Sequence, residues 1–454
     1  MGKLVKHTST LDMTQGMIPK LVMQYAVPMM LGNLFQILYN TVDSIVVGNY
    51  VGTQALAAVG STGMIIGMTV AFFNGFSLGA GVIIGKYFGA KEFEKLHRTV
   101  ETTITMALVL CAVLTAVGTA AVKPLLRLMD TPEDVLPQAT RYLRIYYMGI
   151  SGLLMYNIGS AIVRAVGDTK RPLYFLILTS LLNIVLDILF VIVFQTGVAG
   201  VAYATIISQF VSALLVLRLL TVSQDFYHLR WNELGLDWEI FRQIVSVGIP
   251  TGLQSVISQL SNVFVQSYIN AFGSSCMAGW SCYNKVEQFV FQPVQSISAT
   301  ATAFVSQNIG AEKWERADRG TFVVAIVGVL FVAVFGLPVM FLAEYVIRLF
   351  TSDTAVVAFG VLFIQTNGIF IFFNCVNFVF AGALRGMGDS RAPMIIMILN
   401  FVVFRQLYLF LLSPCTISTP QLVGLGYPVG WVGACLLEVI YYLRKRRHMA
   451  EKQP

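Results

Sequence analysis

Charge is scarce in this sequence. Asp, Glu, Lys and Arg make up 12% of the 454 residues, whereas hydrophobic residues make up 56% and the mean hydropathy is +0.74. Soluble domains carry about 25% charged residues. The composition therefore excludes an ordinary water-soluble fold and predicts an integral membrane protein.

Residues that bind metals or phosphates are also scarce. The six cysteines form no CxxC pair, and the four histidines lie outside the apolar runs. Neither a metal site nor a histidine-based acyltransferase therefore has its ligands inside the membrane. The sequence contains no GxxxxGK[ST] motif, so direct use of ATP is not expected. We therefore expect a protein that is not an enzyme, needs no cofactor and is driven by an ion gradient.

Long apolar runs are abundant, and none alternates in the manner of a barrel strand. A helix needs roughly 20 residues to cross the hydrocarbon. The runs predict an all-α integral membrane protein with twelve spans, at about 20–47, 54–85, 99–122, 137–163, 172–196, 198–220, 242–271, 276–308, 320–343, 355–384, 393–413 and 424–443.

The distribution of the 30 Lys and Arg residues predicts the orientation. Most of them collect on one side of the predicted spans, and basic residues near span ends stay in the cytoplasm. Both termini are therefore expected to be cytoplasmic. The net charge of +7 follows from this bias, so no nucleic acid partner is expected. The chain begins with a polar segment, and its first span is too long for a signal peptide.

Several motifs occur twice, always 221 positions apart. "RAVGDTKRP" (164–172) recurs as "RGMGDSRAP" (385–393), "YFGAKEFEKLHR" (87–98) as "NIGAEKWERADR" (308–319), and "NYVGTQALA" (49–57) as "NAFGSSCMA" (270–278). A constant offset indicates an internal duplication, over roughly 15–220 and 238–443. Six spans per copy is an even number, so the repeats are parallel and are expected to form two six-helix lobes.

The duplication predicts the domain organisation. An N-terminal lobe covers 1–220, a cytoplasmic linker 221–241, and a C-terminal lobe with a basic cytoplasmic tail 242–454. The Gly and Asp of the first repeated motif suit a tight turn. We therefore interpret it mainly as a structural loop, with gating contacts as the alternative.

Acidic residues within spans are costly and mark functional sites. The sequence places three of them deep in the membrane: Asp43, Asp187 and Glu287. Asp187 follows Asn183 by four residues, so both side chains share a helical face and can offer oxygens to one cation. A plain hydrogen bond between these two residues is the structural alternative.

Static pairing is the alternative for the other two acids. Asp43 has two basic residues within spans as candidate salt-bridge partners, Lys285 and Arg405. Glu287 lies two residues from Lys285, and such neighbours do not face each other on a helix. A partner elsewhere and a role in a cavity both stay open for Glu287.

At these positions the sequence resembles the multidrug and toxic compound extrusion (MATE) family, especially its bacterial, DNA-damage-inducible protein F-like branch. The similarity covers the whole chain, and its motifs are "LYNTVDSIVVGNYVG", "GKYFGA", "RAVGDTKRP", "NIVLD", "GVAGVAYATIISQ" and "SQNIGA". The resemblance implies a two-lobe antiporter in the bacterial cell (inner) membrane that exports amphipathic, mostly cationic compounds in exchange for Na+ or H+. It also implies roles for Asp43 as the coupling acid, Pro28 as the bend before it, and Asn183, Asp187 and Thr205 as a cation site able to hold Na+.

The C-terminal lobe departs from one branch of that family. The seventh span of that branch carries a glutamate and its tenth an aspartate, where this chain has Gln254, Gln259, Asn374 and Asn377. A second ion site is therefore not expected there. The candidate cavity or gating residues are Pro28, Gln259, Glu287 and Arg405.

Three other functions fit the sequence less well than an antiporter. A lipid-linked precursor flippase of the same superfamily would line its cavity with basic residues, and a membrane enzyme acting on prenyl or acyl chains would need paired Asp motifs or a histidine in the membrane. A passive channel is disfavoured by the long duplication with acids chiefly in one half. The expected partners are small-molecule organic cations and the lipid bilayer, and the chain is expected to be a monomer.

Overall fold

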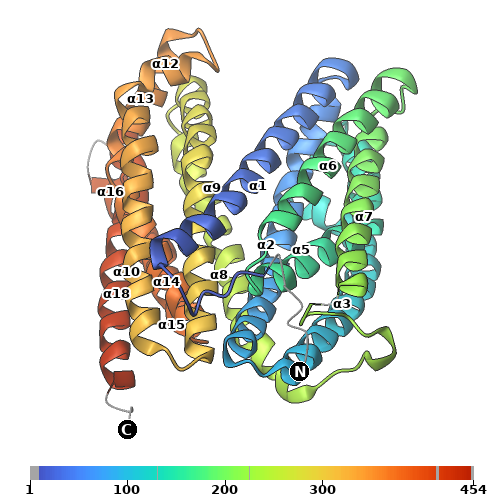
Figure 1. Ribbon diagram of the computed structural model, residues 1–454. Coiled ribbons are helices and arrows are strands. Elements are labelled where there is room, and N and C mark those ends of the chain that lie inside the picture. The colour runs from blue at the N-terminus through green and yellow to red at the C-terminus, as the bar shows by residue number, and fades with distance from the viewer. Residues whose placement is uncertain (1–9, 130, 224, 416–418, 451–454) are drawn as a thin grey trace, which may run out of the picture. The chain divides into compact units, whose positions relative to one another are not determined.

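The computed structural model consists of helices and the loops between them (Figure 1), and it describes residues 10–129, 131–223, 225–415 and 419–450. Within these ranges no strand occurs. The all-α membrane fold predicted from the apolar runs is confirmed.

The helices of the first half follow the predicted spans closely. They are α1 (Ile18–Val46) with the π-helical segment η1 (Val47–Val51), α2 (Thr53–Ala90), α3 (Phe93–Leu128), α4 (Leu136–Met148), α5 (Ile150–Ala165), α6 (Lys170–Asp187) with the π-helical segment η2 (Ile188–Val193), and α7 (Val198–Val222).

The second half begins after a connection that contains the short 3₁₀ helix η3 (Trp231–Glu233). It comprises α8 (Trp238–Asn270), α9 (Ser274–Gly310), α10 (Trp314–Phe331) with η4 (Val332–Gly336) and α11 (Leu337–Phe341), α12 (Ala343–Arg348), α13 (Thr354–Gly368), α14 (Ile371–Gly386), α15 (Arg391–Ile398) with η5 (Leu399–Phe404) and α16 (Arg405–Cys415), α17 (Pro420–Gly424) and α18 (Gly426–Ala450).

Each of the twelve predicted spans coincides with one helix or with consecutive helices. Eight helices of the described residues are long and apolar enough to cross a membrane, and the pair α13 and α14, bent by 52°, makes a ninth span. The other three predicted spans, the fourth, seventh and eighth, are not among these helices. The fourth is divided at Gly149 into α4 and α5, whereas α8 and α9 are long but richer in polar residues.

The chain divides into two compact units whose boundaries lie inside helices. One unit contains 1–12 and 27–249, and the other contains 13–26 and 250–454. Two of the boundaries coincide with prolines, because Val27 precedes Pro28 within α1 and Ile249 precedes Pro250 within α8. The domain limits predicted from the duplication stay a prediction.

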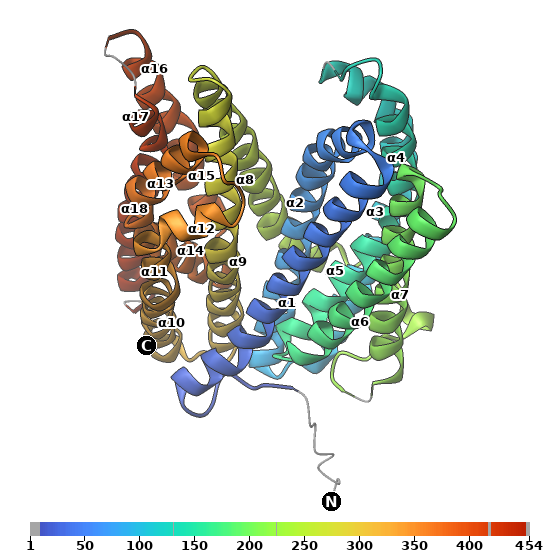
Figure 2. The same cartoon turned by 90° about the horizontal axis from the view of Figure 1, so that it is seen from above.

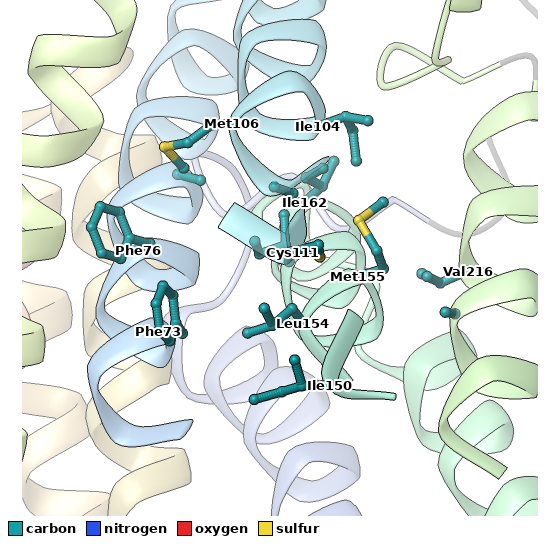
Figure 3. Close-up of a cluster of buried hydrophobic side chains, with 14 of the residues drawn as sticks. Phe73, Phe76, Ile104, Met106, Cys111, Ile150, Leu154, Met155, Ile162 and Val216 are labelled. Carbon is teal, nitrogen blue, oxygen red and sulfur yellow. The ribbon is translucent and has the colours of Figure 1, made fainter. Parts of the chain in front are cut away.

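In the first unit α5 packs against α2, α3, α6 and α7. Figures 1 and 2 both show α5, α6 and α7 side by side. The backbones of α5 and α7 approach closely at Gly152, where a Cβ atom would lie 2.9 Å from the backbone nitrogen of Phe210. Small residues allow such contacts between membrane helices. The core around α5 is apolar, and Figure 3 shows Leu154 and Met155 among its buried side chains.

In the second unit α9 and α14 are central to the packing. Helix α9 packs against α10, α13 and α14, and α14 also packs against α18. Trp280 of α9 is buried and contacts the rings of Phe363 and Tyr427 edge to face, with centroids 4.7 and 5.3 Å away. An aromatic cluster therefore forms part of this core.

The repeated motif at 164–172 and 385–393 forms a tight turn followed by a helix cap. Gly167 has a φ of 94° and Gly388 a φ of 83°, which side chains other than glycine rarely adopt. The Asp168 carboxylate accepts hydrogen bonds from the backbone N–H groups of Lys170 and Arg171, both at 3.1 Å. Asp389 accepts one from Ala392 at 3.2 Å. The repetition thus preserves the turn geometry that starts α6 and α15.

Candidate functional site

A polar cavity of about 100 Å³ lies within the first unit. It is bounded by α1, α5, α6 and α7, and its lining consists mostly of amide, hydroxyl and aromatic side chains. Arg164 is the one lining residue among the described parts of the chain with a formal charge. Pro28, Asn183 and Thr205, three of the residues predicted from the sequence, all line this cavity.

The carboxyl groups of Asp43 and Asp187 lie within hydrogen-bonding distance of each other. They follow the lining residues Tyr39 and Asn183 by four positions on α1 and α6, which places both acids one helical turn beyond the cavity lining. Asp187 is fully buried, and neither of its oxygens accepts a hydrogen bond from a donor group. Two carboxyl groups in contact either share a proton or need a cation between them to stay ionised together. We refer to Asp43 and Asp187 as the acid pair.

Polar groups without partners continue from the acid pair into the cavity. Asn183 is 2% exposed, and neither its amide oxygen nor its amide nitrogen has a hydrogen-bond partner. The Thr205 hydroxyl on α7 donates to the carbonyl of Val201 at 2.9 Å, which leaves oxygen lone pairs to accept or to bind a cation. The structure therefore brings Asp43, Asp187 and Asn183 to one end of the cavity that Thr205 also lines.

The helices change geometry directly after both acids. The π-helical segment η1 begins four residues after Asp43, and η2 begins one residue after Asp187. The two segments contact each other, and π-bulges are frequent at functional sites. Val47 and Val191 from these segments belong to a small apolar cluster, which limits the access of water to the acid pair from that end.

The candidate residues of the second unit form a separate arrangement. Glu287 of α9 and Arg405, the first residue of α16, interact electrostatically. The Arg405 guanidinium lies over the ring of Tyr427, 4.9 Å from its centroid. Gln259 is half-buried on α8. Pairing of Glu287 and its role in a cavity both stay predictions.

Two buried acids within predicted spans were missed from the sequence, Glu101 of α3 and Glu438 of α18. Glu438 of α18 is fully buried and neither carboxyl oxygen has a hydrogen-bond partner, so the expectation of three deep acids was wrong. Arg385 interacts with it electrostatically and donates a hydrogen bond to Gln254 at 3.0 Å. Glu438 lies inside the predicted span 424–443 and precedes the basic run 444–447 by less than two turns.

These observations define a class of protein. An all-helical membrane fold with an internal repeat, a polar cavity and paired carboxyl groups beside it is typical of membrane transporters, in which ionisable residues within spans mark the path of substrates and ions.

Comparisons with known proteins identify the family. The MatE family model matches the chain twice, over residues 28–189 and 250–410. Probable multidrug resistance protein YpnP of Bacillus subtilis is 28% identical over 437 residues, which cover 95% of this chain and 96% of that protein. Probable multidrug resistance protein NorM of Thermotoga maritima is 27% identical over 423 residues, covering 92% and 89%.

A solved structure agrees with the fold. It is described as the outward-facing conformation of a multidrug resistance MATE family transporter of the MOP superfamily, and it superposes with a TM-score of 0.93 at 23% identity, covering 98% of this chain and all of that one. Because the family model matches more than half of the residues, the chain belongs to the MatE family. The resemblance inferred from the motifs is confirmed, and the chain is a transporter rather than an enzyme. Its assignment to the DNA-damage-inducible protein F-like branch stays a prediction.

Proposed function

We propose that this protein is a secondary active antiporter that exports amphipathic, mostly cationic compounds in exchange for H+ or Na+. The observation that carries the proposal is the contact between the carboxyl groups of Asp43 and Asp187 beside a polar cavity. The curated relatives described above are named multidrug resistance proteins, which supports drugs or toxic compounds as the substrates.

The acid pair supplies one exchangeable charge. With one proton or one monovalent cation bound, the acid pair carries a net charge of −1. Without it, two negative charges face each other. A cationic substrate near the cavity stabilises the second state, and an incoming ion stabilises the first. Each ligand therefore favours a different protonation or ion-binding state, which is the differential affinity that coupling requires.

The magnitude of the driving force follows from one charge. Moving one elementary charge across 100 mV is worth about 2.3 kcal/mol, which supports about a 50-fold gradient of a neutral substrate. A monovalent cationic substrate exchanged one for one cancels this electrical contribution. Its export then depends on the concentration gradient of the coupling ion.

The donor set is compatible with Na+ as well as with H+. Asn183, Asp187 and Thr205 offer amide, carboxylate and hydroxyl oxygens, which are the ligands that hard cations prefer. Within the described parts of the chain the Asn183 amide has no hydrogen-bond partner, so its oxygen is available. We infer that these three residues, with Asp43 beside them, form the cation site.

The lining of the cavity favours drug export over flipping of lipid-linked precursors. A flippase for anionic headgroups would need several basic side chains, and the described lining contains Arg164 alone. Tyr39 and Tyr156 provide aromatic faces that attract organic cations. We further propose that the protein acts as a monomer in the bacterial inner membrane with both termini in the cytoplasm.

Neutralising either acid tests the proposal. In proteoliposomes, efflux of a fluorescent organic cation driven by imposed H+ or Na+ gradients should be lost in Asp43→Asn and in Asp187→Asn, because the remaining carboxyl no longer has to share an ion. Both variants should still insert, since removing a buried charge does not raise the cost of insertion. Asp134→Asn, the same change at an exposed position, is the matched control.

The two ions give different results. If Na+ couples transport, Asp187→Asn weakens Na+ binding at fixed pH and fixed membrane potential; if H+ couples it, Na+ is dispensable and efflux follows the pH gradient. Efflux by Asp43→Asn and Asp187→Asn with wild-type rate and ion dependence would show that the acid pair is only a packing feature.

A further inference from the structure

The repeated motif begins with an arginine in both copies, Arg164 and Arg385. Arg164 lines the cavity of the first unit. Its counterpart Arg385 lies at the end of α14 and is buried. A buried charge within a membrane span marks a functional site by default. The acid pair does not involve Arg385, so its role in the second unit has to be found among its own neighbours.

Gln254 joins Arg385 to two other helices of the second unit. Gln254 is buried in α8, four residues after Pro250. Its amide oxygen accepts a hydrogen bond from the Arg385 guanidinium at 3.0 Å, and its amide nitrogen donates to the sulfur of Met397 in α15. The Arg385 side chain therefore ties α14 to the part of α8 that follows Pro250. Its Nε–H group has no hydrogen-bond partner within the described residues.

Glu438 of α18 is the acid that interacts electrostatically with Arg385. It is fully buried, and in the part of the chain that the structure describes neither carboxyl oxygen has a hydrogen-bond partner. Helix α18 packs against α14, and Cys435, one turn before Glu438, contacts the backbone of Asn377 in α14. The carboxyl group therefore lies beside the helix that carries Arg385, but the guanidinium donates to Gln254 instead.

The one other charged group that acts on Glu438 is already neutralised. Asp389, in the turn after α14, interacts with Glu438 electrostatically. Asp389 forms an ion pair with Lys445 and also accepts a hydrogen bond from the Tyr441 hydroxyl at 2.9 Å. Its negative charge is therefore balanced locally, and the charge that Glu438 faces is that of Arg385.

The remaining polar groups of the helices packed against α18 lie elsewhere. Arg391, the first residue of α15, is exposed. Arg405 of α16 lies over the ring of Tyr427, which precedes Glu438 by eleven residues, or about 16 Å along α18. The Tyr408 hydroxyl of α16 donates to the carbonyl of Leu422 at 3.0 Å. None of these groups supplies the hydrogen bonds that the Glu438 carboxyl lacks.

We propose that Glu438 is a proton-binding site of the second unit and that its proton decides whether Arg385 bonds Gln254 or Glu438. A buried carboxylate without donors is too costly to stay ionised, so the observed arrangement is the protonated state. When the proton leaves to water, the negative oxygen attracts the guanidinium, because a charge-assisted hydrogen bond is about twice as strong as a neutral one. Gln254 then loses its donor, and the tie between α14 and α8 is released.

This site differs from the acid pair in chemistry as well as in place. The acid pair consists of two carboxyl groups that share one ion, whereas Glu438 exchanges its proton against a guanidinium. One proton is released, one hydrogen bond of Arg385 is exchanged for another, and the net charge of the second unit falls by one. The site therefore gives the second copy a response to protons that does not need the acids of the first.

Infrared spectroscopy of the purified full-length protein in lipid tests the proposal. A protonated buried carboxyl has a C=O stretching band that an ionised carboxylate lacks. We expect this band at neutral pH in the wild type, and its Glu438 component should be missing in Glu438→Gln. Glu315→Gln is the matched control, because Glu315 is exposed on α10 of the same unit and pairs with Arg319 at 3.6 Å. That variant should leave the band unchanged.

Two variants should shift the titration of this band in opposite directions. Gln254→Met removes the competing acceptor at similar volume, so Arg385 turns to Glu438 and the proton is lost at a lower pH, with an affinity weakened about tenfold or more. Arg385→Met removes the attracting charge, so the proton should be retained to a higher pH than in the wild type. If Arg385→Met folds poorly, Gln254→Met decides the matter alone.

The proposal is overturned if Glu438→Gln removes no protonated band at neutral pH, because Glu438 would then be ionised. It is equally overturned if Gln254→Met titrates as the wild type does, since Arg385 would then not be shared. Asp43→Asn should leave the Glu438 band and its titration unchanged, and loss of the band in that variant would assign it to the acid pair instead. The readout is a spectrum rather than transport, so it is separate from the test of the antiport.

Discussion

A close backbone contact in the first unit makes a specific prediction about stability. A Cβ atom added at Gly79 of α2 would lie 2.5 Å from the carbonyl oxygen of Ile244 and 3.0 Å from the backbone nitrogen of Gly248, both in α8. Because the obstructing atoms are backbone, no side chain can rotate away. Ordinary contacts begin at 3.4 Å, so Gly79→Ala must separate the two helices by about 0.9 Å.

The magnitude follows from two opposing effects. Overpacking of this kind costs about 1–3 kcal/mol, and replacing glycine by alanine in a helix recovers about 1 kcal/mol. Because backbone atoms cannot yield, we take the upper end of the overpacking range, and the net loss is about 2 kcal/mol. For a unit of this size 1 kcal/mol shifts the melting temperature by about 2–4 °C, so we expect Gly79→Ala to melt about 4–8 °C below the wild type.

Thermal unfolding of detergent-purified protein, followed by fluorescence-detected gel filtration, measures this shift. Gly60→Ala is the matched control on the same helix, because nothing lies within 4 Å of the Cβ position at Gly60. That variant should melt at the wild-type temperature or slightly above. If Gly79→Ala is as stable as Gly60→Ala, the α2 and α8 backbones do not touch and the packing argument is wrong.

The remaining predictions concern the repeated loop and the orientation. Burial raises the pKa of Asp168, whereas the ion pair and hydrogen bond with Lys445 outweigh burial and lower the pKa of Asp389. The charge of Asp389 therefore stabilises the fold above its unfolded pKa, and this contribution is lost as the pH falls through its lower folded value. Asp389→Asn should lower the free energy of unfolding at pH 7 by about 1 kcal/mol, and Asp168→Asn should lower it less. Equal losses of stability in the two variants would contradict this assignment. In a cysteine-free background, cysteine at exposed Lys170 should react with an impermeant thiol reagent only from inside, and cysteine at exposed Tyr50 only from outside; labelling of position 170 in intact cells would refute the topology.

The spans and the turns could be predicted from the sequence because their causes are local. An apolar run of sufficient length specifies a membrane helix whatever lies beside it. The repeated Gly167 and Asp168 specify a turn and a helix cap through contacts within a few residues. The shared helical face of Asn183 and Asp187 follows from a spacing of four.

The proximity of Asp43 and Asp187 could not be predicted from the residues alone. The two acids are separated by more than a hundred positions, and only the packing of α1 and α6 brings them together. The family resemblance assigned Asp43 as the coupling acid and Asp187 to a cation site, and predicted Asp43 near that site, without giving the contact between the two carboxyl groups. Glu101 and Arg385 show the same limit, because a charge near the end of an apolar run looks solvent-exposed until neighbouring segments cover it.

The boundaries at Pro28 and Pro250 exchange helix segments between the two copies of the repeat. Residues 13–26 belong to the unit otherwise built from the second copy, and the start of α8, up to Ile249, belongs to the unit built from the first. Each exchanged segment contacts the unit that it joins. The backbone N–H of Met13 donates to Gln307 at 2.9 Å, and α8 meets α2 at Gly79.

The beginning of the first helix of each copy therefore belongs to the unit built from the other copy, which is the geometry of a domain swap. A single copy on its own therefore lacks the helix segment that completes its unit. A gene split within 221–237 would leave neither product with a complete core, and the two fragments would fold only when synthesised together.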